Sequence, residues 1–178
     1  MSWRKQMFEG STEFSPINSS LLVVVPCGQT KIWKFDPKHG PAKAMDAYAG
    51  SPFQVNKSFA QLFSDRWVIL SAKHGFMDPD FMIPEDYDVT FKKPASKPMS
   101  LGELEKQVQE KHLLDFNIVV ALGGEEYTDI VTRLFSRHSK VIAPTKGLAL
   151  GLGMQRMKSF LNLSREEMLR RITSQNQR

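Results

Sequence analysis

The hydrophobic pattern of the chain predicts an α/β fold. Four short apolar runs, rich in β-branched residues, alternate with longer segments of helical periodicity, and these runs cover residues 20–25, 66–71, 116–122 and 141–143. An apolar run without polar alternation is typical of a strand that is buried on both faces, as in a parallel sheet. We therefore predict a mainly parallel four-stranded sheet between two layers of helices, a three-layer α/β/α arrangement.

Helices are predicted in the segments between these runs. A helix over 42–63 is broken before Pro52, which suits the first turn of the second piece, with Ser51 as its N-cap. Ser100 and Glu103 have the spacing of a capping box at the start of another helix. We expect further helices over 125–138, 151–162 and 164–178, the last of them at the surface, and residues 1–18 as an N-terminal arm of a single domain that spans 1–178.

The segment 72–98, named the excursion below, interrupts this alternation. It has no helical period, contains four prolines, and exceeds the length of about 12–15 residues that loops in compact domains rarely pass. Its apolar side chains are too many for a disordered linker; they are Phe76, Met77, Phe81, Met82, Ile83, Tyr87 and Phe91. We expect it to be ordered and to pack over the carboxyl edge of the sheet, close to the loop after the first strand.

Composition limits the class of protein. The chain has 178 residues, of which 41% are hydrophobic and 24% charged, which is ordinary for one soluble domain with a sizeable core. No apolar run approaches the roughly 20 residues of a membrane helix, and the first residues lack the apolar stretch of a signal peptide, so we expect a cytoplasmic protein. A single cysteine, Cys27, and four scattered histidines argue against a disulfide and a structural metal site, and we expect no cofactor.

The charge is concentrated in the second half. Residues 1–90 carry 9 Lys/Arg against 10 Asp/Glu, whereas residues 91–178 carry 15 against 9, which makes the halves −1 and +6. A basic half of this kind is typical of nucleic-acid binding proteins, although many small basic proteins bind nothing anionic in particular.

Three polar stretches at the ends of strands or in the excursion could carry chemistry. They are 28–31 (GQTK), 71–75 (SAKHG) and 84–88 (PEDYD). Because the carboxyl ends of parallel strands meet at one edge of a sheet, we expect one pocket that contains Gln29, Lys31, Tyr48, Lys73, His74 and Asp88. The alternative is that these stretches are ordinary turns with solvated side chains.

A second group of candidates lies in the basic half. Gly123 and Gly124 lead directly into a helix that begins with Glu125 and Glu126, and a glycine-rich loop covers residues 144–156. In that loop Leu148 or Leu150 could fill the gap that a flipped base leaves, or Leu148, Leu150 and Leu152 could all be core residues.

Four motifs together resemble a known family. The segments PCGQTK (26–31), AMDAYAGSPF (44–53), ILSAKHG (69–75) and Tyr87-Asp88 are similar to an uncharacterised bacterial and phage family of α/β domains with CGxxK, AxxxYxxSxxF, LSAKxG and YD motifs. That family resembles peroxide-stress DNA-binding proteins and the central domain of archaeosine synthase, both in the uracil-DNA glycosylase-like fold group. The resemblance covers about residues 20–162 and implies that fold.

The resemblance also implies that the usual catalytic aspartate is missing from the loop after the first strand. Uracil-DNA glycosylases have a Gly-Gln-Asp-Pro-Tyr-like loop after a strand, and Gly28 and Gln29 fit it, but Thr30 stands at the place of its aspartate and Lys31 at that of its proline. A glycosylase would need a carboxylate from elsewhere, and our order of preference is Asp88, Asp86, Asp46.

The leading hypothesis is a DNA glycosylase that hydrolyses the N-glycosidic bond of a modified or damaged base in double-stranded DNA, with defence against phage as its setting. The alternatives are a nucleotide- or nucleoside-processing enzyme with Gly123 and Gly124 as a phosphate cradle, a DNA-binding protein without catalysis, and an enzyme with Cys27 as a thiol nucleophile. For a glycosylase, the catalytic candidates are Asp88, Lys31, Lys73 and His74; the base-binding candidates are Cys27, Gly28, Gln29, Tyr48, Ser51, Gly124, Glu125 and Tyr127; and the DNA-backbone candidates are Lys92, Lys93, Lys146, Gln155, Arg156 and Lys158.

Overall fold

The core of the protein is a five-stranded sheet with strand order β4-β3-β1-β6-β7. The computed structural model describes residues 18–174. Its strands are β1 (Leu21–Pro26), β3 (Arg66–Ser71), β4 (Gly75–Met77), β6 (Ile118–Ala121) and β7 (Lys140–Ile142). β1 pairs in parallel with β3 and β6, and β6 with β7, whereas β4 runs antiparallel to β3. The predicted four parallel strands are confirmed, but the prediction of a four-stranded sheet is wrong because β4 adds an antiparallel edge strand.

β1 forms the centre of the sheet and is buried on both faces. Leu21, Val23 and Val25 point into one core cluster, and Leu22 and Val24 into the other. This alternation follows from the two-residue period of a strand. Because β1 has a hydrophobic layer on each side, its carboxyl end is held firmly by packing.

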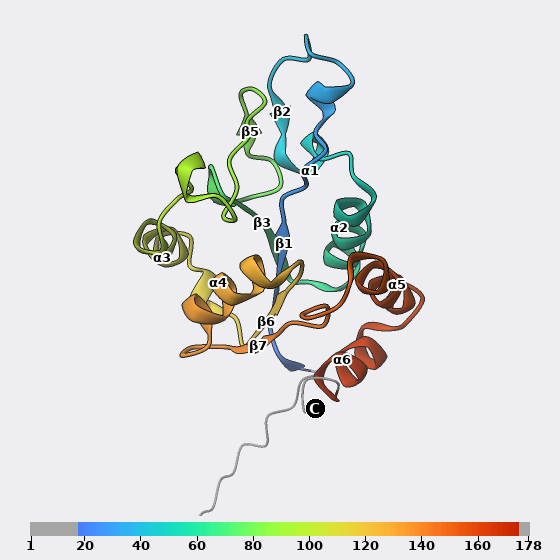
Figure 1. Ribbon diagram of the computed structural model, residues 1–178. Helices are drawn as coiled ribbons and strands as arrows, with labels where there is room; N and C mark the ends of the chain where they lie inside the picture. Colours follow the sequence, from blue (N-terminus) through green and yellow to red (C-terminus); the bar gives the residue numbers. More distant parts are fainter. Residues whose placement is uncertain (1–17, 175–178) are drawn as a thin grey trace, which may run out of the picture.

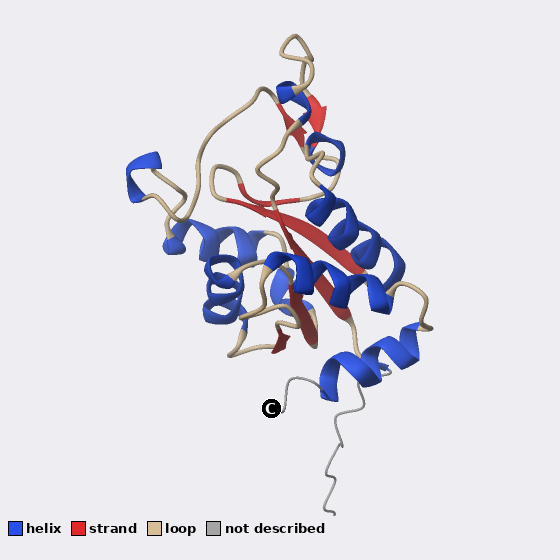
Figure 2. Cartoon of the chain, turned by 45° about the vertical axis from the view of Figure 1, so that its right-hand side comes forward, coloured by secondary structure: helices blue, strands red, loops and turns tan. Residues whose placement is uncertain are grey.

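Helices cover both faces of the sheet, as Figures 1 and 2 show. The helices α2 (Ser51–Phe63), α5 (Leu150–Phe160) and α6 (Arg165–Ser174) contribute to the cluster that contains Val23, and α3 (Leu101–Glu110) and α4 (Glu125–Phe135) to the one that contains Val24. The three-layer arrangement is therefore observed. No helix among residues 18–174 is long and apolar enough to cross a membrane.

The segment between β1 and α2 differs from its prediction. It contains a 3-10 turn, η2 (Ile32–Lys34), then β2 (Ala42–Lys43) and the short helix α1 (Ala44–Ala47). β2 pairs with β5 (Met82–Ile83) in a small second sheet. The break before Pro52 is confirmed, but Gly50 is the N-cap of α2 and Ser51 its first residue, so the N-cap prediction for Ser51 is wrong.

The excursion is ordered, as expected. It supplies β4, β5 and a 3-10 turn, η3 (Pro94–Ser96), before the chain enters α3. Phe76 and Met77 are buried in β4, and Ile83 and Tyr87 are buried farther along. Ser100 and Glu103 form the predicted capping box at the start of α3.

The ends of the chain were predicted as an arm and a surface helix. Residues 1–17 and 175–178 lie outside the described residues, so the N-terminal arm is not described beyond residue 18. After η4 (Leu113–Asp115) and the last strands, α6 occupies most of the predicted tail helix. Its Met168, Leu169 and Ile172 are buried, so this helix is part of the core as well as of the surface.

Asp78 joins three elements at one end of the sheet. Its two carboxylate oxygens each accept a hydrogen bond of 2.9 Å, one from Arg66 at the start of β3 and one from Lys111 after α3. Partial burial raises the pKa of Asp78, but the hydrogen bonds and charges of Arg66 and Lys111 outweigh this and hold the pKa below its ordinary value.

The lowered pKa predicts a pH dependence of stability. The contribution of Asp78 is fully present above its unfolded-state pKa and is lost as the pH falls through the lower folded-state pKa. We expect Asp78→Asn to lower the free energy of unfolding by roughly 1 kcal/mol at neutral pH, since the pair is partly exposed. The difference between wild type and variant should shrink below about pH 4, in urea denaturation followed by circular dichroism. A difference that persists unchanged at low pH would contradict the role of this charge.

Candidate active site

A pocket of about 850 Å³ lies at the carboxyl ends of β1 and β6. Five segments form its walls: the loop after β1, the start of α2, the excursion from Tyr87 to Lys93, the turn into α4, and the loop and first turns of α5. Ligands of open α/β sheets bind at this edge, where the loops after the strands converge. A large pocket therefore lies at the edge of the sheet where the sequence predicted the site.

The pocket includes about half of the predicted site residues. Of the catalytic and base-binding candidates, it is lined by Lys31, Asp88, Cys27, Gly28, Gln29, Gly124 and Tyr127; of the DNA-backbone candidates, by Lys92 and Lys93. The residues that do not line it are Lys73, His74, Tyr48, Ser51, Glu125, Lys146, Gln155, Arg156 and Lys158. The expectation of one pocket that includes Tyr48, Lys73 and His74 is therefore wrong.

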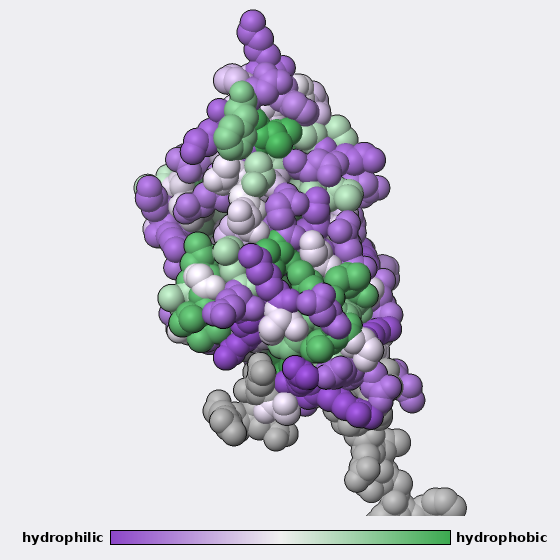
Figure 3. Space-filling model, turned by 90° about the vertical axis from the view of Figure 1, so that its right-hand side faces the viewer, coloured by the Kyte–Doolittle hydropathy of each residue, from purple (hydrophilic) through white to green (hydrophobic). Residues whose placement is uncertain are grey.

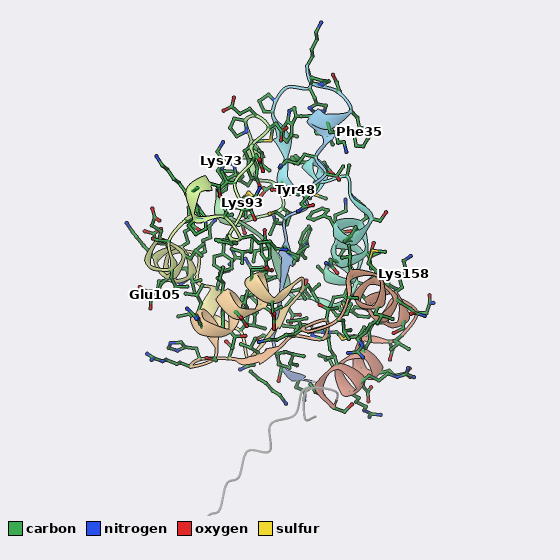
Figure 4. The ribbon with its side chains drawn as sticks, viewed as in Figure 1. Phe35, Tyr48, Lys73, Lys93, Glu105 and Lys158 are labelled. Atoms are coloured by element: carbon green, nitrogen blue, oxygen red, sulfur yellow. The ribbon has the colours of Figure 1, made fainter. Side chains whose placement is uncertain are left out.

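Tyr87 lines the pocket and contacts all three of these residues. Its hydroxyl lies 2.6 Å from the hydroxyl of Tyr48 and 2.8 Å from that of Ser71, both in hydrogen bonds. The His74 ring packs edge-on against the Tyr87 ring, with 5.1 Å between centroids, and the ammonium of Lys73 lies 5.3 Å from that ring. Tyr87 thus joins the excursion to the end of β3. Figure 4 labels Tyr48 and Lys73 in this region.

Lys31 supplies a fixed positive charge to the pocket wall. Its ammonium donates a hydrogen bond of 2.6 Å to the carbonyl oxygen of Tyr87 and lies 3.4 Å from the carboxylate of Asp86. It also lies 4.4 Å from the centre of the Tyr87 ring, and its side chain is only 11% exposed. The carbonyl, the carboxylate and the ring hold the ammonium at the pocket wall, where it can contact a negatively charged group of a ligand.

Two acidic residues of the excursion have different surroundings. Asp86 accepts a hydrogen bond from the backbone N–H of Tyr87 and pairs with Lys31, but it does not line the pocket. Asp88 lines the pocket, is exposed, and has no ion pair or side-chain hydrogen bond within residues 18–174. Asp46, the third candidate, is exposed on α1 and does not line the pocket. Asp88 is therefore the one of these three carboxylates that lines the pocket.

Cys27 lies at the base of the pocket beside Tyr127. The sulfur is 3.2 Å from the hydroxyl of Tyr127, in a hydrogen bond. Burial raises the pKa of Cys27, and hydrogen bonds from Tyr127 and the Ala72 backbone, with the charge of Lys31, only partly oppose this. A thiol with a raised pKa is a poor nucleophile at neutral pH, which argues against the thiol-nucleophile alternative.

The chain's three tyrosines surround this cysteine. Burial is the main reason that the pKa values of Tyr48, Tyr87 and Tyr127 are all raised above the ordinary value. Their hydroxyls are therefore neutral at physiological pH and can donate hydrogen bonds. Of the three, Tyr87 and Tyr127 line the pocket.

His74 is not placed as a catalytic cation. Its ring packs against Phe81 and Tyr87, and burial followed by the charge of Lys73 lowers the pKa of His74. Its Nε2 is buried and has no hydrogen-bond partner within the described part of the chain. A neutral ring that does not line the pocket cannot stabilise charge inside it.

The loop before α5 is tied to the sheet and presents leucines at the surface. Thr145 donates a hydrogen bond to the carbonyl of Gly123, and Arg156 donates one to the carbonyl of Pro144. Leu150 is 70% exposed and Leu152 58% exposed, so the alternative that they are core residues is wrong for both. Figure 3, viewed from the side of α2 and α5, shows apolar patches among hydrophilic side chains on this face.

Several pocket residues were not among the candidates from sequence. They include Asn56 on α2, Glu126 on α4, Thr90, Thr145, and Met154 and Met157 on α5. Glu126 lies 3.5 Å from the ammonium of Lys92, which joins α4 to the excursion. Asn56 could have been found because it lies one helical turn after Pro52 and three residues after Phe53.

Comparisons with known proteins identify a family for this chain, but the names that they give describe no activity. A model of DUF6884, described as a family of unknown function, matches residues 22–159. A protein of Bacillus subtilis (strain 168), described as "Uncharacterized protein YfjM", is 38% identical over 146 residues, which cover 82% of this chain and 95% of that protein. No solved structure matches.

Proposed function

The chain belongs to the DUF6884 family, and from its own pocket we propose that it is a DNA N-glycosylase that excises a modified or damaged base. One observation carries the proposal: the carboxylate of Asp88, which is unpaired within residues 18–174, and the fixed ammonium of Lys31 line the same pocket at the carboxyl edge of the sheet. Opposite charges at one site match the charge that develops when an N-glycosidic bond breaks.

In this reaction the sugar gains positive charge and the departing base gains negative charge. Asp88 stabilises the sugar cation or orients the water that attacks it. Lys31 stabilises the departing base without being consumed. We assign no catalytic role to Lys73 or His74, because they do not line the pocket.

The surroundings of the pocket suit a base flipped out of duplex DNA. Flipping costs a few kcal/mol, which phosphate contacts and a group that fills the vacated space must offset. Lys92 and Lys93 line the excursion wall, and the exposed Leu150 lines the pocket from the opposite side. We propose Leu150 as that filling group, the uracil-DNA glycosylase-like fold as the framework, and defence against phage with modified DNA as the setting.

Salt dependence tests which lysines meet the DNA. If about four phosphates are contacted, the logarithm of the binding constant should fall with log salt at a slope near −3 to −4. We expect Lys92→Ala with Lys93→Ala to flatten this slope by about 1–2 units. Lys158→Ala should change it little, because Lys158 extends from the outer side of α5 (Figure 4). Lys106→Ala on α3 is the matched control, and a wild-type slope near zero would contradict DNA binding.

One observation favours a second candidate, an enzyme that acts on free nucleosides. Glu126 lines the pocket in the first turn of α4, just after Gly123 and Gly124. A carboxylate there disfavours a phosphate cradle at that helix N-terminus but can accept hydrogen bonds from sugar hydroxyls. This favours a nucleoside over a nucleotide as the alternative substrate.

A base-release assay separates the candidates. The protein is incubated with unmodified and modified phage genomic DNAs and, separately, with free nucleosides. Strand breaks in the DNAs are measured before and after alkali, and the free base released from the nucleosides is measured by chromatography. Breaks that need alkali support a monofunctional glycosylase. Breaks without alkali and a product trapped by borohydride would make Lys31 a Schiff-base nucleophile instead. Release from nucleosides alone supports the second candidate, and DNA binding without any release supports a non-catalytic DNA-binding protein.

A further inference from the structure

One side of the pocket is formed by α2 and α5, which pack against each other. Each helix contributes residues at positions i, i+1 and i+4, which lie on one helix face. They are Pro52, Phe53 and Asn56 from α2, and Gly153, Met154 and Met157 from α5. This side of the pocket is therefore an apolar wall that contains one amide.

Asn56 has no structural role that explains an amide in this wall. It is half-buried, and among the described residues that line the pocket from α2 and α5 it alone has a hydrogen-bonding side chain. Its side chain makes no hydrogen bond within residues 18–174, whereas the neighbouring Gln54 donates one to the carbonyl of Tyr48. In binding pockets a few polar groups on apolar walls fix the orientation and identity of the ligand.

We propose that Asn56 is the specificity-determining residue of this site and pairs with the hydrogen-bonding edge of a nucleobase. The inference rests on the proposed function, because it assigns the base-reading group of that same pocket. A nucleobase combines apolar faces, which suit Phe53, Met154 and Met157, with an edge of donors and acceptors. A side-chain amide offers one donor and one acceptor side by side, so it matches an edge that carries an acceptor next to a donor.

If the Asn56 amide reads the base, substitutions of Asn56 should change the base preference in a defined direction. Asn56→Asp keeps the size of the side chain but offers two acceptors, so it should favour the guanine edge, where two N–H donors are adjacent. Asn56→Leu keeps a similar volume without any hydrogen bond and should weaken binding of the preferred base about 10- to 100-fold. Gln61→Leu is the matched control, since Gln61 is an exposed amide on α2 outside the pocket.

The test measures binding separately from catalysis. Thymidine, deoxycytidine, deoxyadenosine, deoxyguanosine and hydroxymethyl-deoxycytidine are titrated into the full chain and its variants, at up to about 10 mM, by calorimetry. We expect wild type and Gln61→Leu to bind at least one nucleoside equally well. Asn56→Leu should lose it at an unchanged melting temperature, and Asn56→Asp should move the order of affinities toward deoxyguanosine.

The outcomes distinguish this inference from the proposed function. Nucleoside binding that depends on Asn56, with no base release from any DNA, would support the inference and reject the glycosylase. Base release by Asn56→Leu with the base preference of wild type would overturn the inference and leave the glycosylase in place. Binding of no nucleoside by wild type would also overturn it.

Discussion

Replacing Asp88 by asparagine is expected to slow base release by about 10²–10³-fold, because it removes the negative charge that we assign to stabilising the sugar cation. The exchange keeps the volume of the side chain. Asp88 is exposed and has no ion pair within the described residues, so the melting temperature and salt-dependent DNA binding should stay near the wild-type values. Single-turnover release from modified DNA, measured beside thermal unfolding, checks both expectations.

Two other aspartates of the excursion provide variants for comparison. Asp80→Asn should act like wild type, because Asp80 is exposed outside the pocket. Asp86→Asn removes the charge that pairs with Lys31, although the amide oxygen can still accept from the Tyr87 N–H, so it should loosen the excursion at the Lys31 contact and lower both stability and rate. Release by Asp88→Asn at the wild-type rate would contradict the catalytic role of Asp88 and make Glu126, the other carboxylate among the described residues that line the pocket, the candidate.

Replacing Gly123 by alanine is expected to cost about 2–5 kcal/mol of unfolding free energy. Gly123 has a φ of +107°, a conformation that L side chains rarely adopt, and an added Cβ would lie 2.7 Å from Cγ of Pro26. Pro26 ends β1, so the clash would displace the loop that carries Cys27 and Gly28 as well as the turn into α4. Base release should therefore fall together with stability.

The neighbouring glycine provides the matched control. Gly124 has an ordinary φ of −75°, and an added Cβ would meet only the flexible end of Glu126 at 3.3 Å. Gly124→Ala should therefore change the unfolding free energy by no more than about 1 kcal/mol. Urea denaturation of both variants gives the comparison, and equal stabilities would mean that the turn relaxes without strain.

Much of the fold could be predicted from sequence because its signals are local. The apolar runs marked all four parallel strands, and their short length and β-branched residues distinguished them from helices. The Ser100–Glu103 capping box joins residues three apart, so its spacing predicted the start of α3 correctly. Similarly, Pro52 marked the break before α2, although the N-cap is one residue earlier than expected.

The sequence did not reveal β4. It has three residues, too few to show a period, and it forms because Gly75 at a φ of +68° turns the chain back along β3. Gln107 on α3 then accepts a hydrogen bond from the backbone N–H of Phe76. The two hydrogen-bonding partners of β4, strand β3 and Gln107, lie on other elements, so only the folded chain decides that residues 75–77 form a strand.

For the candidate site, too, the sequence predicted one part and the tertiary structure decided the rest. The sequence by itself determined which loops meet at the carboxyl edge, because parallel strands deliver their ends to one side of the sheet. The tertiary structure decided which side chains of those loops reach the pocket: Lys31 and Asp88 do, whereas Lys73 and His74 contact Tyr87 and do not line the pocket. It also decided that Asn56 joins the site, since that depends on how α2 packs against α5. The apolar runs and the helices between them are local signals that indicate parallel strands, whereas the loop side chains that reach the pocket are chosen by contacts between residues far apart in the chain.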